Sequence, residues 1–200
     1  MPKKFTEKEK EVIRQRLKEE AMNLLNTYGL KKSSVDELVK RVNIPKGTFY
    51  LFYESKELLF FEAINELHQD IQKRLVIELS NISDKISVDT LTDILMMLYQ
   101  EVNQSGLLQI LMSSDIELIT RKLPEEVVKE HLAQDDFHVG KLFQMLGTKE
   151  PKNTEAFSGA LRAIFMTMLH KREIGEDVFD ESLRLMLRGV IIQMMGVKES

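Results

Sequence analysis

The sequence predicts an all-α protein of about nine helices, in which a small N-terminal domain precedes a larger helical C-terminal domain. Apolar residues recur at steps of three and four along most of the 200-residue chain, which is the spacing of a helix with one buried face. No segment alternates with the period of two that a half-buried strand requires. Helix breakers are few, with 9 Gly and 4 Pro, and several of them separate the periodic segments.

The first predicted helix starts at a capping box formed by Thr6 and Glu9, and it ends at Gly29. A second capping box, Ser34 with Glu37, starts a helix of about two turns. In such a box the hydroxyl oxygen of the first residue accepts a free backbone N–H, and the glutamate accepts a hydrogen bond from the backbone of the cap.

Residues 43–45, Asn-Ile-Pro, then break the chain. Asn tolerates left-handed backbone angles, and Pro starts a helix well but cannot continue one. A third short helix begins at Lys46. Two short helices and a tight turn within residues 35–53, preceded by a longer helix, have the spacing of a helix-turn-helix.

One side of the third helix is suited to DNA. Successive residues lie about 100° apart, so Lys46, Tyr50 and Leu51 share a side, and three aromatic residues face the opposite way. Lys and Ser can meet phosphates, Thr can reach a phosphate or a base edge, and Gly47 lets the backbone approach closely. The candidate DNA-binding residues are Ser34, Lys46, Gly47, Thr48, Tyr50 and Lys56.

Residues 47–59, GTFYLFYESKELL, together with SSVDEL at 33–38, closely resemble the N-terminal signature of the TetR family of transcriptional regulators. The resemblance covers about residues 6–65. It implies a homodimeric repressor that leaves a pseudo-palindromic operator in double-stranded DNA when a small apolar or amphipathic inducer binds the larger domain. By the family pattern, DNA contact is made by Lys46, Gly47, Thr48, Tyr50 and Lys56.

Three positions depart from the commonest family pattern. Asn43 stands where Gly is usual in the turn, and Pro45 replaces a frequent Ser. Phe52 occupies a position where His or Tyr often binds phosphate. Because Pro45 and Phe52 lack those polar groups, neither is assigned to the DNA interface.

A long fourth helix is predicted from Ser55 to Leu79 and links two domains, residues 1–54 for DNA binding and residues 55–200 for ligand binding and dimerisation. Stretches rich in Ser, Asn, Asp, Gly and Pro separate the later helices. These are predicted near residues 88–104, 107–117, 125–146, 154–173 and 177–196.

Composition excludes several classes of protein. The absence of Cys excludes disulfides, thiolate metal sites and Cys nucleophiles. No apolar run approaches the roughly 18 residues of a membrane span, and the charged start cannot be the core of a signal peptide, so we expect a cytoplasmic chain without membrane contact. Residues 1–60 carry 13 Lys or Arg and 9 Asp or Glu, whereas residues 61–200 carry 15 and 23. Only the N-terminal part therefore favours a polyanion.

The larger domain is rich in Met and aromatic residues, which can line an adaptable cavity. Most of them are expected to be ordinary core residues, because core filling is the default use of an apolar helical position. The candidate ligand-binding residues are Met96, Tyr99, Met112, Phe143, Phe165 and Met168. A drug-like cation, a lipid-like acyl compound and a metabolite stay open as ligands.

The last two predicted helices are candidates for a dimer interface. The helix near residues 177–196 is apolar almost all round, which is more than one domain core can cover. Pairing it and the helix near residues 154–173 with their symmetry mates makes a four-helix interface; the alternative is a helix buried within a monomer. The candidate interface residues are Phe157, Leu161, Ile164, Leu183, Leu187, Val190, Ile191 and Met194.

Other chemistry receives little support. His131, Asp135 and His138 would share one helical face, but no fourth metal ligand is visible, so we predict neither a metal nor a cofactor. There is no pair of Glu-x-x-His motifs, no nucleophile with a nearby base and no phosphate loop, so we expect no enzyme. A helical protein-interaction adaptor without DNA binding is the alternative function, and the salt dependence of DNA binding separates the two.

Overall fold

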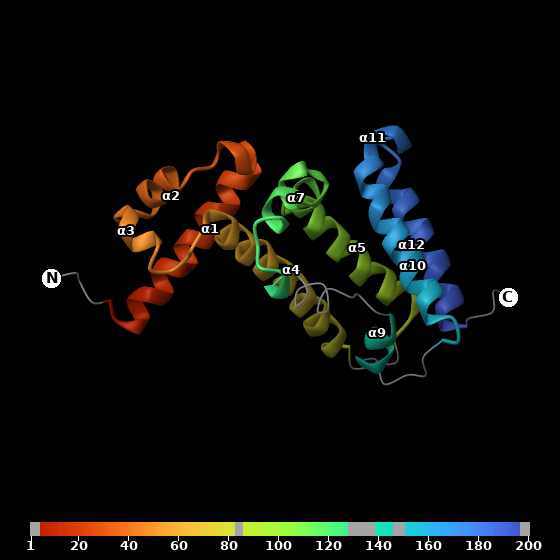
Figure 1. Ribbon diagram of the computed structural model, residues 1–200. Helices are drawn as coiled ribbons and strands as arrows, with labels where there is room; N and C mark the ends of the chain where they lie inside the picture. The colour runs from red at the N-terminus through yellow and green to blue at the C-terminus, as the bar shows by residue number, and fades with distance from the viewer. Residues whose placement is uncertain (1–4, 83–85, 128–138, 146–150, 197–200) are drawn as a thin grey trace. The chain divides into compact units, whose positions relative to one another are not determined.

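The computed structural model describes residues 5–82, 86–127, 139–145 and 151–196, and within these ranges it contains eleven α-helices, one 3-10 turn and no strand. The all-α class predicted from the sequence is confirmed (Figure 1). No helix in the same ranges is both long and apolar enough to span a membrane. The elements are α1 (Glu7–Lys32), α2 (Val35–Val42), α3 (Lys46–Phe49), α4 (Lys56–Ser80), α5 (Val88–Gln104), α6 (Leu107–Met112), α7 (Ser114–Thr120), α9 (Val139–Met145), α10 (Thr154–Thr167), η1 (Met168–His170), α11 (Lys171–Ile174) and α12 (Phe179–Met195).

The helices group into two compact units. The first unit comprises residues 1–69 and 106–134, and the second comprises residues 70–105 and 135–200. The first unit is larger than the predicted DNA-binding domain, because it also takes the first part of α4 together with α6 and α7. The assignment of separate functions to residues 1–54 and 55–200 stays a prediction.

The first unit is built around α1. The hydroxyl oxygen of Thr6 accepts the Glu9 N–H at 3.2 Å, and the Glu9 carboxylate accepts the Thr6 N–H at 2.9 Å, so the predicted capping box is confirmed. α1 packs on α2, α6 and α7, and α2 packs on α3. The core is formed by large apolar side chains without solvent exposure or nearly so, among them Leu17, Leu24, Leu38, Phe49, Leu59 and Phe60.

Two predicted helices are divided in the structure. Ser113 has an extended backbone, with φ −76° and ψ 155°, so it ends α6, and its hydroxyl oxygen accepts the Asp115 N–H to start α7. The predicted helix near residues 154–173 is interrupted by η1 between α10 and α11. Such interruptions leave the apolar spacing nearly intact, so the sequence pattern does not reveal them.

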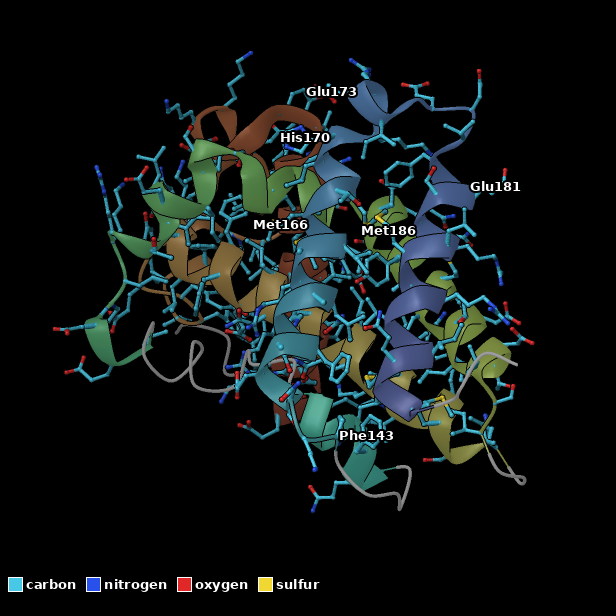
Figure 2. The ribbon with its side chains drawn as sticks, turned by 90° about the vertical axis from the view of Figure 1, so that its right-hand side faces the viewer. Phe143, Met166, His170, Glu173, Glu181 and Met186 are labelled. Carbon is cyan, nitrogen blue, oxygen red and sulfur yellow. The ribbon has the colours of Figure 1, made fainter. Side chains whose placement is uncertain are left out.

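In the second unit, α12 packs against α5 and α10. α10 and α12 lie side by side, as seen face on in Figure 2. Two surface ion pairs join α12 to α5, Arg184 with Asp93 at 2.6 Å and Arg188 with Asp89 at 3.2 Å. The buried stripe of α12 consists of Phe179, Leu183, Leu187, Ile191 and Met194.

Candidate nucleic-acid interface

Ser34 sets the start of α2. Its backbone is extended, and its hydroxyl oxygen accepts the Glu37 N–H at 3.2 Å. The predicted hydrogen bond from the Ser34 N–H to the Glu37 carboxylate is wrong, because this carboxylate accepts from Nε of Arg41 at 2.9 Å instead. A carboxylate prefers a charged donor on its own helix face to a neutral N–H at the cap. Ser34 is therefore placed as predicted, at the exposed N-terminus of α2.

The turn between α2 and α3 follows the predicted chemistry. Asn43 adopts the left-handed conformation, with φ 60° and ψ 50°. The backbone N–H of Ile44 donates to the Val39 oxygen at 3.0 Å and closes the end of α2. Pro45, with φ −62°, stands at the N-cap of α3 and needs no hydrogen-bond partner for its own nitrogen. α2 and α3 are thereby held in a helix-turn-helix.

α3 directs its aromatic residues to opposite sides. Phe49 and Tyr53 are buried, whereas Tyr50 is 53% exposed and Leu51 is 73% exposed. The rings of Phe49 and Tyr50 meet edge to face at 5.2 Å, which holds the Tyr50 ring at the border of the core. A Cβ at Gly47 would meet no atom within 4 Å. This side of α3 is free to approach another molecule.

Thr48 is not on that free side. It is only 8% exposed, and its backbone N–H donates to the Pro45 oxygen at 2.8 Å. Its hydroxyl has little surface to offer to a base edge. The DNA contact predicted for Thr48 therefore gains no support from its burial and stays a prediction.

Lys46 is exposed at the start of α3 and is already paired. Its Nζ lies 2.9 Å from Oδ1 of Asp36, in the first turn of α2. The hydrogen bond from Lys46 to Asp36 and the charge of Asp36 raise the pKa of Lys46, so its ammonium is charged at neutral pH. Because an exposed pair of this kind is weak, a phosphate can compete for Lys46.

Lys56 is half-buried, and its ammonium group is hydrogen-bonded to backbone carbonyl oxygens. Its Nζ donates to the carbonyl oxygens of Leu30 at 3.0 Å and Ser33 at 2.7 Å. An ammonium has three donors, so one remains for a phosphate. Besides the predicted DNA contact, Lys56 therefore has a structural role, which is to bind the backbone between α1 and α2.

Three exposed lysines of the first unit were missed by the sequence analysis. Lys31 and Lys32 follow the last buried residue of α1, and Lys40 lies near the end of α2. Within the described residues, none of the three takes part in a salt bridge that offsets its charge. The signal was a basic doublet directly before Ser33 and Ser34.

Comparison with known proteins agrees with this geometry. The sequence model for bacterial regulatory proteins of the tetR family matches residues 17–63, from α1 into α4. The chain is also 26% identical over 169 residues to YdgC of Bacillus subtilis (strain 168), described as an uncharacterised HTH-type transcriptional regulator; the match covers 72% of this chain and 87% of YdgC. The comparisons support a TetR family transcriptional regulator, with the family's own sequence model confined to residues 17–63.

Two solved structures share the fold of this chain. A transcriptional regulator from Aquifex aeolicus VF5 has a TM-score of 0.62 at 21% identity, covering 89% of this chain and 99% of that one. RolR, solved with resorcinol bound, has a TM-score of 0.51 at 16% identity, covering 93% of this chain and 96% of that one. The matched residues include α2 and α3 and support a DNA-binding helix-turn-helix, and the family and the structural neighbours are transcriptional regulators rather than enzymes.

Most of the predicted ligand-binding residues of the regulator lie in the core of the second unit. Met96, Tyr99, Phe143 and Met168 are buried there, and the Tyr99 hydroxyl donates to the Leu161 oxygen at 2.9 Å. Phe165 is half-buried and meets the Tyr99 ring edge to face at 5.9 Å. Met112 ends α6 in the first unit, and its side chain lies outside the described residues, as do His131, Asp135 and His138.

The predicted dimer residues are mostly used inside the protomer. Leu161, Ile164, Leu183, Leu187, Ile191 and Met194 are buried in the second unit, and Phe157 and Val190 are half-buried. Buried residues have no surface left for a second copy. The outward faces of the same two helices instead present Ala156, Gly159, Ala163 and Met166 on α10, and Leu185, Gly189 and Ile192 on α12.

Proposed function

We propose that this TetR family regulator is a homodimeric repressor whose two copies of α3 enter the major groove at the two halves of a pseudo-palindromic operator. The observation that carries the proposal is the open side of α3, where Tyr50 and Leu51 are exposed and Gly47 has free space. Tyr50 and Lys46 meet phosphates, Leu51 contacts a thymine methyl, and Gly47 lets the backbone approach. Ser34, Thr48 and Lys56 complete the proposed DNA-binding set.

The dimer proposal is supported by the outward faces of α10 and α12 rather than by the residues first predicted. Met166 lies on the α10 side of this surface (Figure 2), and Leu185 of α12 is 66% exposed. A Cβ added at Gly159 or Gly189 would meet no atom within 4 Å, so neither helix is crowded there. Small residues let helices approach closely, and two copies of such a face form an isologous four-helix contact.

The ligand proposal is supported by the aromatic and Met-rich core around Tyr99 and by the resorcinol complex of RolR. Resorcinol is a small aromatic molecule with two hydroxyls, and the buried Tyr99 side chain offers both a ring and a hydroxyl oxygen that can accept a hydrogen bond. α4 belongs to both units, so a ligand that binds better when α4 is displaced changes DNA binding. A coupling of about 1–3 kcal/mol lowers operator affinity about 5- to 150-fold.

Selection of bound sequences from a random DNA pool tests the proposal. We expect an enriched inverted repeat whose two halves are centred about one helical turn, or a multiple, apart. Gel shifts on that sequence with candidate small molecules then identify the inducer by the loss of the shifted band. A pool without enrichment, from a protein that is folded and dimeric, would contradict DNA recognition of this kind.

The salt dependence of DNA affinity distinguishes the repressor from the alternative, a protein-interaction adaptor. A repressor loses DNA affinity steeply as salt rises, with a slope close to the number of phosphates that it neutralises. An adaptor shows no such slope on any duplex.

A further inference from the structure

The corner between α1 and α2, residues 29–34, is bound from outside the helix-turn-helix. Gly29 interrupts α1 with φ 73° and ψ 171°, a region that only Gly occupies readily. The change of direction releases the Leu30 N–H from the helical ladder. Leu30 itself is buried, so this N–H needs a partner within the protein.

Asp115 of α7 supplies that partner. Its Oδ2 accepts the Leu30 N–H at 2.7 Å, across 85 positions of the chain. A hydrogen bond to a charged acceptor is stronger than one between neutral groups, and its partial burial shields it from water. A Cβ at Gly29 would lie 2.9 Å from the same Oδ2, so the carboxylate reaches the backbone only because residue 29 has no side chain.

The carbonyl side of the corner is held from α4. Leu30 O accepts from Nζ of Lys56 at 3.0 Å and from the Ser33 N–H at 3.2 Å, and Ser33 O accepts from Lys56 at 2.7 Å. Both polar backbone groups of Leu30 are therefore bound by charged side chains, one from α7 and one from α4.

An ion pair joins the end of α7 to the start of α4. Nζ of Lys122, directly after α7, lies 2.8 Å from Oε1 of Glu57 in the first turn of α4. Gly106, at the start of α6, is also close to α1, since a Cβ there would lie 2.5 Å from Oδ1 of Asn26. α6 and α7 thus lie close to α1, on which both helices pack.

The position of this corner decides where α2 begins. Ser34 caps α2 one residue after Ser33, and α2 packs on α3. We propose that Asp115 is a positioning residue for operator binding, which fixes the α1–α2 corner through Leu30 and so aligns α2 and α3 with DNA. Displacement of α7 then moves the helix-turn-helix. This inference rests on the proposed function, because it assumes that the protein binds an operator; the contacts of Asp115 do not depend on that assumption.

The test compares operator DNA with mixed-sequence DNA for three proteins: the natural chain, Asp115→Ala and Asp115→Asn. We expect Asp115→Ala to lower operator affinity about tenfold, because a hydrogen bond to a charged group is lost, while mixed-sequence affinity changes less than about twofold. Asp115→Asn keeps an acceptor oxygen and should restore most of the operator affinity. Faster hydrogen exchange of the Leu30 amide in Asp115→Ala should accompany the loss.

Glu117→Ala is the matched control, because it removes a carboxylate from the same helix whose partner is the exposed Arg121 at 2.6 Å. It should leave both affinities unchanged. If Asp115→Ala does not fold, Asp115→Glu replaces it, since a longer carboxylate displaces the corner without removing the charge. Equal changes on both DNAs, or an unchanged ratio in every variant, would overturn the positioning role. Failure of the natural chain to select any operator would instead contradict the proposed function.

Discussion

Lys46 and Asp36 form an ion pair across the helix-turn-helix, and both side chains are exposed, by 53% and 72%. The carboxylate of Asp36 therefore neutralises a cation on the surface that we propose to approach DNA. A phosphate must displace or share it. We infer that the free protein holds its DNA affinity below what its cations alone would provide.

Replacing Asp36 by Asn should tighten binding to all DNA sequences about two- to fivefold, because the exposed ion pair is weak and its loss frees the Lys46 ammonium for a phosphate. Titration of labelled operator and mixed-sequence DNA at several salt concentrations measures this. Asp70→Asn is the matched control, since Asp70 pairs with Lys73 at 2.8 Å on an exposed part of α4. Weaker binding by Asp36→Asn would show that Asp36 orients Lys46 instead of competing for it.

Lys46→Ala is expected to act in the opposite direction. It should weaken binding to all sequences and lower the salt slope by about two, because each of the two copies loses one phosphate contact. With Lys46 absent, the further change of Asp36 to Asn should have a smaller effect than it has alone. Additive effects would contradict a direct link between the two residues.

The helix-turn-helix was predictable because its signals are local. Ser34 caps the amide three residues ahead, and Asn43 is a residue type that tolerates the left-handed conformation of the turn. The clamp at Leu30 was not predictable, because its partners Asp115 and Lys56 are 85 and 26 positions away. The burial of Thr48 likewise depends on packing that a helical wheel for one short helix cannot represent.

The dimer residues illustrate the same limit. The apolar character of the last helices predicts a second contact face, which stays a prediction, but periodicity does not tell which face meets the protomer's own core. α12 buries the stripe through Leu187 and Ile191 and leaves Leu185 outside. The spacing of apolar residues defines the stripes of α12, but the positions of α5 and α10 decide which stripe is buried in the protomer.

Glu57 gives the first unit a dependence on pH. Burial of the Glu57 carboxyl raises its pKa, but the hydrogen bond from Lys122, a backbone hydrogen bond and the charges of Lys122 and Lys56 together lower the pKa below its usual value. The ionised pair therefore stabilises the fold above the pKa of an unfolded Glu, about 4.3, and the contribution is lost as pH falls through the lower pKa of the folded state.

Lys122→Met should lower the free energy of unfolding at pH 7 by about 1 kcal/mol, a modest value because Lys122 is 64% exposed. The difference from the natural chain should shrink as pH falls from the pKa of an unfolded Glu, about 4.3, towards the lower pKa of Glu57 in the folded natural chain, because the ion pair is lost when Glu57 is protonated. Denaturant unfolding at pH 7 and pH 3.5 measures both values. Arg121→Met, which breaks a surface pair, should show a smaller loss, and a difference that grows in acid would contradict the assignment to Glu57.

Gly29 and Gly47 should respond in opposite ways to Ala. In Gly29→Ala, a residue with a side chain must adopt φ 73°, and its Cβ would lie 2.9 Å from Oδ2 of Asp115. We therefore expect a loss of about 2 kcal/mol in unfolding free energy. Gly47→Ala meets open space, so stability should stay equal or rise by up to about 1 kcal/mol. DNA affinity should nevertheless fall in Gly47→Ala, because the added methyl separates α3 from the phosphates. Unchanged DNA binding there would remove the close backbone approach from the interface.

The outward face of α12 should control association. Leu185→Glu places two like charges at the proposed twofold contact, so we expect sedimentation to show monomers at concentrations where the natural chain is dimeric. Because Leu185 lies outside the protomer core, the helical content should not change. Operator affinity should fall more than half-site affinity, since the two copies of α3 are no longer joined.

Leu187→Ala is the contrasting variant. Because Leu187 is buried, this substitution should lower the free energy of unfolding by about 2–5 kcal/mol without a selective effect on association. A dimer that persists in both Leu185→Glu and Ala163→Glu would place the contact elsewhere.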